Sequence, residues 1–246
     1  MTQQNNKLST ASISLRVLAR LLAYPDAELR NQLSEMDAAL QAEQALAPQR
    51  LNELVALIRT LQHGNALENE AEYVQLFDRG RATSLHLFEH VHGDSRERGP
   101  AMIDLAQTYE KAGLYLGPDE MPDYLPVVLE FVSTQPTKEA RAFLGEMAHI
   151  FNAIFNALQQ RQSPYASVLG ALLELSGEKA HAVKVQVEEA LDTAWEEPVA
   201  FDGCSVKGQA KPGEEQAMVF IKKTAQGQHQ TPSDGRIKNS IEGVTA

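Results

Sequence analysis

The segment from residue 137 to residue 158 constrains the fold more than any other part of the chain. Its apolar side chains recur at steps of three and four residues, the spacing of one face of an α-helix. They are Phe143, Leu144, Met147, Ile150, Phe151, Ile154, Phe155 and Leu158. Because this stripe is wide, the helix must be covered by several neighbours. The segment predicts a central helix that begins at Thr137.

Similar stripes elsewhere predict further helices, each bounded by a start or stop signal. Asp26 follows the Tyr24-Pro25 break and suits an N-cap, and Pro48 suits the first helical position. The glycines that suit helix stops are Gly64, Gly113 and Gly177. The expected helices cover residues 13–22, 26–40, 48–61, 67–77, 100–109, 122–132 and 164–173. No segment shows sustained strand alternation, so we expect an all-α, single-domain helical bundle over residues 9–197.

The last part of the chain differs in composition from the rest. Residues 205–246 hold five Gly, two Pro, five Gln and one aromatic residue, Phe220. Such a segment buries too little apolar surface to offset its conformational entropy, so residues 198–246 are predicted to form a disordered, flexible tail. Its one apolar group, at residues 218–221, precedes Lys222 and Lys223. A short docking segment there is possible, but an idle tail is the favoured interpretation.

Charge and cysteine content exclude several classes of protein. The net charge of the 246-residue chain is −11, which argues against a nucleic-acid partner and favours a basic one. Cys204 is the only cysteine, so no disulfide forms within the chain, as suits a cytoplasmic protein. No apolar stretch approaches the roughly 20 residues of a membrane span, so stable membrane association is not expected.

Residues 76–99 form a charged segment that is unusual in its density of ionisable groups. It holds four Arg, four Asp or Glu and three His around an apolar group at residues 85–88. Within it, His86, Glu89 and His90 match H-x-x-E-H, a zinc hydrolase pattern if it lies on a helix. Hydrogen bonding or contact with a partner is the stronger interpretation. A zinc metallohydrolase stays an alternative.

Two further motifs have ordinary structural explanations. Arg79 and Arg81 could hold a phosphate or carboxylate, although surface pairing with Asp78 and a neighbouring aspartate is simpler. Pro122 is expected to open a helix, which places Asp123 in its first turn, where a carboxylate complements the helix dipole.

These motifs resemble those of the nitrate reductase molybdenum cofactor assembly chaperones, also called the nitrate reductase delta subunits. The resemblance rests on RLLAYPD at residues 20–26, on YVQLFDRGRATSLHLFEHVHGDSRERG at residues 73–99 and on EMPDYLP at residues 120–126. It extends over roughly residues 12–200. The last motif is shared with the wider group of redox-enzyme maturation chaperones, which usually has His where this chain has Tyr124.

The resemblance implies a cytoplasmic chaperone that is not an enzyme and has no cofactor of its own. Its client would be the catalytic alpha subunit of a respiratory nitrate reductase, bound through that subunit's N-terminal peptide. Binding would enable molybdenum cofactor insertion, with cofactor delivery proteins as further partners, and delay docking at the membrane. A helical scaffold without a dedicated client is the remaining alternative.

An amphipathic peptide helix can lay its apolar face in a groove between chaperone helices. The residues predicted to bind the peptide come from the charged segment and from the 120–126 motif. They are Phe77, Asp78, Arg81, Leu87, Phe88, His90, Pro122, Asp123, Tyr124 and Leu125. No residue is assigned a catalytic or metal-binding role.

Overall fold

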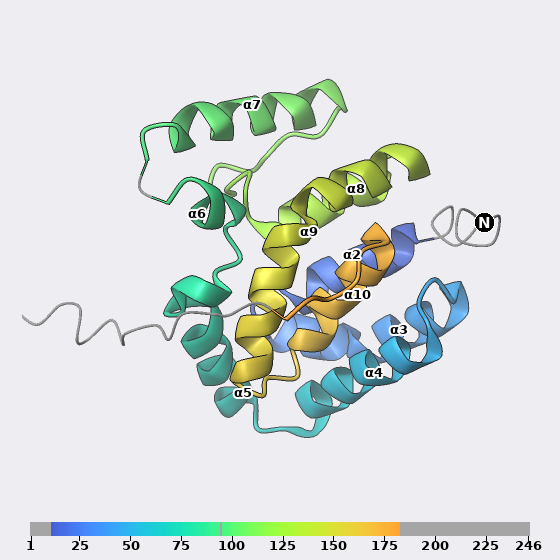
Figure 1. The fold of residues 1–246 in the computed structure, drawn as a ribbon. Coiled ribbons are helices and arrows are strands. Elements are labelled where there is room, and N and C mark those ends of the chain that lie inside the picture. The colour runs from blue at the N-terminus through green and yellow to red at the C-terminus, as the bar shows by residue number, and fades with distance from the viewer. Residues whose placement is uncertain (1–10, 94, 183–246) are drawn as a thin grey trace, which may run out of the picture. The chain divides into compact units, whose positions relative to one another are not determined.

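A computed structural model describes residues 11–93 and 95–182 (Figure 1). The helices are α2 (Ser12–Leu21), α3 (Ala27–Glu43), α4 (Pro48–His63), α5 (Ala66–Tyr73), α6 (Leu87–Val91), α7 (Arg98–Lys111), α8 (Leu125–Thr134), α9 (Thr137–Gln160) and α10 (Ala166–Ser176). A π-helical turn, η1 (Val74–Asp78), and a 3₁₀ turn, η2 (Arg81–Thr83), follow α5. Within the described residues there is no strand, only one isolated bridge between His86 and Tyr124. The all-α fold class is confirmed.

The core of the bundle forms where α9 and α10 lie side by side, as Figure 1 shows in yellow and orange. Leu144, Phe151 and Ile154 of α9 have no solvent exposure, as the wide apolar stripe predicted. α10 is buried over almost its whole surface because it contacts both α9 and α4. α2 packs against α8 and α3 and completes the bundle.

The helix boundaries follow the predicted capping signals closely. The Asp26 carboxylate accepts a hydrogen bond from the Leu29 N–H at 2.7 Å, and Pro48 is the first residue of α4. Gly177 follows α10 with a φ of +86°, a conformation in which any side chain would be strained. Gly64 and Gly113 also end their helices.

The chain leaves regular helical geometry between α5 and α6. The predicted helix over residues 67–77 ends at Tyr73 and continues as the π-turn η1, although Leu76 and Phe77 are buried as expected. The Thr83 hydroxyl donates to the Leu76 carbonyl oxygen and closes the turn. A Cβ at Gly80 would collide with both of those oxygen atoms, so the close approach requires glycine there.

Three predictions about helices were wrong in detail. α8 begins at Leu125 rather than at Pro122, because residues 123–125 pair with residues 85–87 instead of joining the helix. α10 begins at Ala166, two residues after Pro164. α7 buries only Tyr109, and Ile103, expected to face inward, is 60% exposed because no element among the described residues covers that face.

Two sets of predictions lie outside the described residues: the boundary of the helical domain at residue 197 and the flexible tail at residues 198–246. Among the residues that the structure describes, no helix is both long enough and apolar enough to cross a membrane.

Candidate functional site

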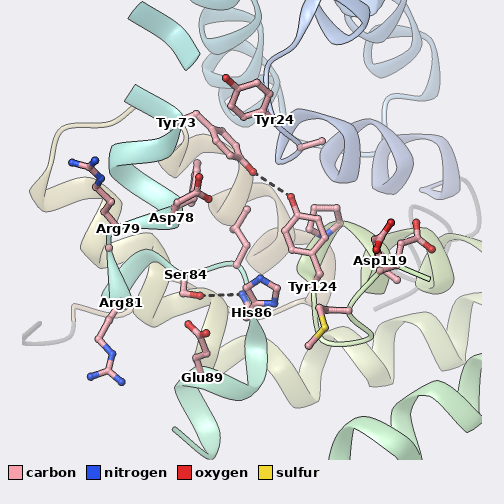
Figure 2. Close-up of a pocket in the computed structure, with 18 of the residues that line it drawn as sticks. Tyr24, Tyr73, Asp78, Arg79, Arg81, Ser84, His86, Glu89, Asp119 and Tyr124 are labelled. Carbon is pink, nitrogen blue, oxygen red and sulfur yellow. Dashed lines mark hydrogen bonds between the residues drawn. The ribbon is translucent and has the colours of Figure 1, made fainter. Parts of the chain in front are cut away.

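A cavity of about 1140 Å³ opens between the end of α2, the η1–η2 turns, α6 and the start of α8. The charged segment supplies one side, and the loop over residues 119–121 with Tyr124, Val127 and Glu130 supplies the other. Figure 2 shows the two sides facing each other. The cavity therefore brings together the two motifs that the sequence singled out.

Four rings, from Tyr24, Tyr73, Phe77 and Tyr124, form an aromatic wall in this cavity. Tyr73 contacts Tyr24 edge to face at 5.6 Å between ring centroids and Phe77 at 4.8 Å. The Tyr73 hydroxyl donates to the Leu22 carbonyl oxygen at 2.7 Å and lies 3.2 Å from the Tyr124 hydroxyl (Figure 2). Burial raises the pKa of Tyr73 above its ordinary value, so this hydroxyl stays neutral. The wall offers flat apolar surface with a fixed polar edge.

An acidic rim surrounds the aromatic wall. It consists of Asp78, Glu89, Asp119, Glu120 and Glu130. The arginines that line the cavity are Arg79, Arg81 and Arg98. Arg98 is partly neutralised, because its guanidinium lies 3.5 Å from the Glu89 carboxylate and 3.7 Å from that of Asp123. Carboxylates outnumber guanidinium groups, so the rim attracts cationic ligands.

Asp123 lies behind the cavity and has no solvent exposure. Its carboxylate accepts a hydrogen bond from the Phe88 N–H at 3.2 Å and lies 3.3 Å from His86 Nδ1. The hydrogen bond with Asp123 raises the pKa of His86 above its ordinary value. A buried carboxylate needs such partners, and here they come from the charged segment. Asp123 thus fixes that segment against the start of α8.

Backbone hydrogen bonds also join the charged segment to the start of α8. The Leu87 N–H donates to the Asp123 carbonyl oxygen at 3.0 Å, and the Leu125 N–H donates to that of Leu85 at 2.8 Å. The Tyr109 hydroxyl donates to the Pro122 carbonyl oxygen at 2.8 Å and ties α7 to the loop. These bonds hold His86 and Tyr124 side by side, with ring centroids 5.4 Å apart.

The ten residues predicted to bind peptide fall into two groups. Those that line the cavity are Phe77, Asp78, Arg81 and Tyr124. Leu87, Asp123 and Leu125 are buried behind it, and Phe88, His90 and Pro122 lie outside its lining, partly exposed. Asp123 was expected in the first turn of α8, but it lies one residue before the N-cap of that helix. Peptide binding stays a prediction for all ten residues, and in the second group direct contact is open only to the partly exposed members.

Sequence reasoning missed several residues of the cavity. Tyr24, Tyr73, Met121 and Glu130 line it but were not named as site residues. Tyr24 and Tyr73 both lie within motifs that carried the family resemblance, so those motifs held the signal. Glu130 could be found only by placing it on α8, about one and two-thirds turns beyond the N-cap Tyr124.

The H-x-x-E-H motif does not have the geometry of a zinc site. α6 begins at Leu87, so His86 precedes the helix with extended backbone angles and does not share a helical face with His90. His90 Nε2 instead lies 2.9 Å from the Ser84 carbonyl oxygen. Within the part of the chain that the structure describes, no three His, Cys, Asp or Glu side chains are placed to hold a metal ion.

Comparisons with known proteins agree with the motifs. Residues 22–170 match the family described as nitrate reductase delta subunit. The nitrate reductase molybdenum cofactor assembly chaperone NarJ of Escherichia coli (strain K12) is 42% identical over 195 residues, which are 75% of this chain and 83% of NarJ. The probable assembly chaperone NarW of the same strain is 40% identical over 193 residues, 74% of this chain and 80% of NarW.

A solved structure of a putative redox enzyme maturation protein from Archaeoglobus fulgidus is also similar. Its TM-score is 0.49 at 21% identity, over 68% of this chain and 94% of that one. The family is one of cofactor assembly chaperones rather than catalytic enzymes, and this chain is not an enzyme. The chain belongs to the nitrate reductase delta subunit family of chaperones.

Proposed function

We propose that this chain is a cytoplasmic chaperone for the catalytic alpha subunit of a respiratory nitrate reductase. It binds the N-terminal peptide of the apo subunit in the cavity between the charged segment and α8. The bound chaperone keeps the subunit open for molybdenum cofactor insertion and delays its docking at the membrane. The names of its relatives, which are assembly chaperones of nitrate reductase, support this client.

The observation that carries the proposal is the pairing of an aromatic wall with an acidic rim in one cavity. The aromatic wall can take the apolar face of an amphipathic helix, as helix-in-groove complexes do. The acidic rim, and the net charge of −11, attract a peptide that also carries basic residues. No bond-forming chemistry is required of any residue in the cavity.

Asp78 and Tyr124 are the predicted site residues best placed for contact. Asp78 is exposed at the rim, and Tyr124 lies partly exposed on the aromatic wall. His90 and Asp123 would act through their neighbours, because their polar atoms are engaged with Ser84 and with His86 and Phe88. We therefore expect their removal to disturb the shape of the cavity rather than a direct contact.

Titration calorimetry with the full chain and a synthetic alpha-subunit N-terminal peptide tests the proposal. We expect binding that weakens by about tenfold or more in Glu130→Lys, because a cation then faces a cationic ligand. Glu146→Lys is the matched control, since Glu146 is an equally exposed glutamate of α9 outside the cavity. Equal affinities of the two variants would place binding elsewhere.

A scaffold without a dedicated client predicts a different result. Such a protein would bind unrelated amphipathic peptides as tightly as the alpha-subunit peptide. A scrambled peptide of identical composition distinguishes the two functions, because it keeps charge and hydrophobicity but loses the helical face. Equal heats for both peptides would favour the scaffold.

A further inference from the structure

A second cavity, of about 370 Å³, adjoins the first along α8. Glu120, Val127 and Glu130 line both cavities. The two therefore form one groove with two chambers, and the shared residues mark the boundary between them. The peptide-binding cavity proposed above is only the first chamber.

The second chamber is lined mainly by apolar and aromatic side chains and is open to solvent. Leu116 and Phe131 line it, and Tyr115 beside it is 80% exposed. A tyrosine so exposed is stabilised little by contacts with its own chain. Exposed apolar surface of this kind marks interaction sites. This chamber suits one aliphatic or aromatic side chain of a partner.

The two chambers lie on one face of α8. Val127, Phe131 and Thr134 are spaced by four and three residues, so they share a helical face. Tyr124 of the aromatic wall is the N-cap of α8, and Phe131 in the second chamber follows it by seven residues, or about 10 Å along the helix. A partner helix of about three turns, lying along α8, reaches from the first chamber into the second.

Charge specifies what lies between the two apolar anchors. Glu120 and Glu130 are exposed at the boundary, so a cation is favoured there. Arg16 also lines the second chamber, and its Nε donates to the Ser133 hydroxyl at 3.2 Å. A second cation beyond the boundary would meet this guanidinium and is disfavoured.

We propose that the groove recognises an amphipathic helix with the pattern apolar, basic, apolar. The first apolar residue contacts the aromatic wall, the basic residue lies between Glu120 and Glu130, and the second apolar residue enters the second chamber. The two apolar residues are about seven positions apart, or two helical turns. This inference rests on the proposed function and extends it to the spacing that the client must satisfy.

Thr134→Trp tests the second chamber, because Thr134 is exposed at its edge and does not line the first. Thr60→Trp is the matched control: Thr60 is also an exposed helical threonine whose hydroxyl bonds to a backbone carbonyl, but it is on α4. The probes are an alpha-subunit N-terminal peptide of about 15 residues and versions shortened at either end by about six, or under two turns. Titration calorimetry measures all of them against the full chain.

We expect Thr134→Trp to weaken binding of the long peptide by about tenfold, which is the effect of losing one anchor. Thr60→Trp should leave the affinity unchanged. The version shortened at the end that fills the second chamber should bind both variants equally. Tyr115→Ser is a second variant. It should fold normally because Tyr115 is 80% exposed, and it should weaken binding of the long peptide but not of the shortened one. Thermal unfolding checks that each variant folds.

The basic residue is tested by a double-mutant cycle. Changing this basic residue of the peptide to glutamine should weaken binding to the unsubstituted chain more than binding to Glu130→Gln, in which Glu120 alone remains as its partner. Normal affinity of the long peptide for both Thr134→Trp and Tyr115→Ser would overturn the inference and leave the proposed function standing. Failure of every peptide to bind the unsubstituted chain would overturn both.

Discussion

The α9–α10 pair and the segment from α6 to α7 are held in place by different forces. In α10, ten of eleven residues are buried, and α9 contributes Leu144, Phe151 and Ile154 to the same core. In α7 only Tyr109 of fourteen residues is buried. The α6–α7 segment depends instead on the Asp123 carboxylate, two backbone hydrogen bonds and the Tyr109 hydroxyl.

This contrast bears on the cavity, because α6 lines one side of it and α8, which packs on α2 and α9, lines the other. α8 gives a firm side, whereas α6 and the part of the charged segment after it are attached to the bundle by few contacts. Elements with few buried apolar contacts open at lower free energy than a core. A chaperone that must take up and release a peptide gains from one fixed and one adjustable side.

The largest effect is expected for the core. Phe151→Ala removes a side chain with no exposure from α9, which should lower the free energy of unfolding by about 3–5 kcal/mol. Denaturant unfolding measures it. The partly exposed Phe143 on the same helix is the control, and Phe143→Ala should cost clearly less. Equal costs would show that α9 is not packed as described.

Asp123→Ala should act on the α6–α7 segment. It leaves the partly buried Phe88 N–H without its acceptor, a loss of about 1–3 kcal/mol. Hydrogen exchange should quicken in α6 and α7 while α9 and α10 keep their protection. Asp123→Asn retains an acceptor of similar shape and should be milder. Uniform loss of protection across all four helices would contradict the contrast between the two regions.

The pH dependence of stability isolates His86. Its folded pKa is raised, so its stabilising effect is complete below the unfolded value of about 6.5 and is lost as pH rises through the folded value. The unsubstituted chain should therefore have a higher free energy of unfolding than His86→Gln, and this difference should be larger at about pH 6 than at about pH 8.5. A difference that stays constant with pH would show that His86 and Asp123 are not coupled.

The smallest effect is expected for the Arg98–Glu89 pair at the rim. Both side chains are partly exposed at a separation of 3.5 Å, so Glu89→Gln should cost less than about 1 kcal/mol. Its effect should shrink further in high salt, because salt screens exposed charges. Thermal unfolding in low and high salt measures it, and a larger loss would mean that this pair, not Asp123, fixes the segment.

The same contrast separates what the sequence predicted from what it did not. The stripe of α9 and the caps at Asp26 and Pro48 identify helices correctly, because periodicity and capping are local. The pairing of residues 85–87 with residues 123–125 is a long-range contact, which no local pattern reports. Asp123 was therefore read as a helix-dipole residue although it is a buried acceptor, and Tyr24 and Glu130 were missed.

Hydrogen exchange of the full chain, with and without the alpha-subunit N-terminal peptide, tests the central claim most directly. If the cavity is the binding site, the peptide should slow exchange in η1, α6 and the first turns of α8 and leave α3 and α4 unchanged. Saturating peptide that alters exchange only outside these cavity elements, or nowhere, would contradict the account.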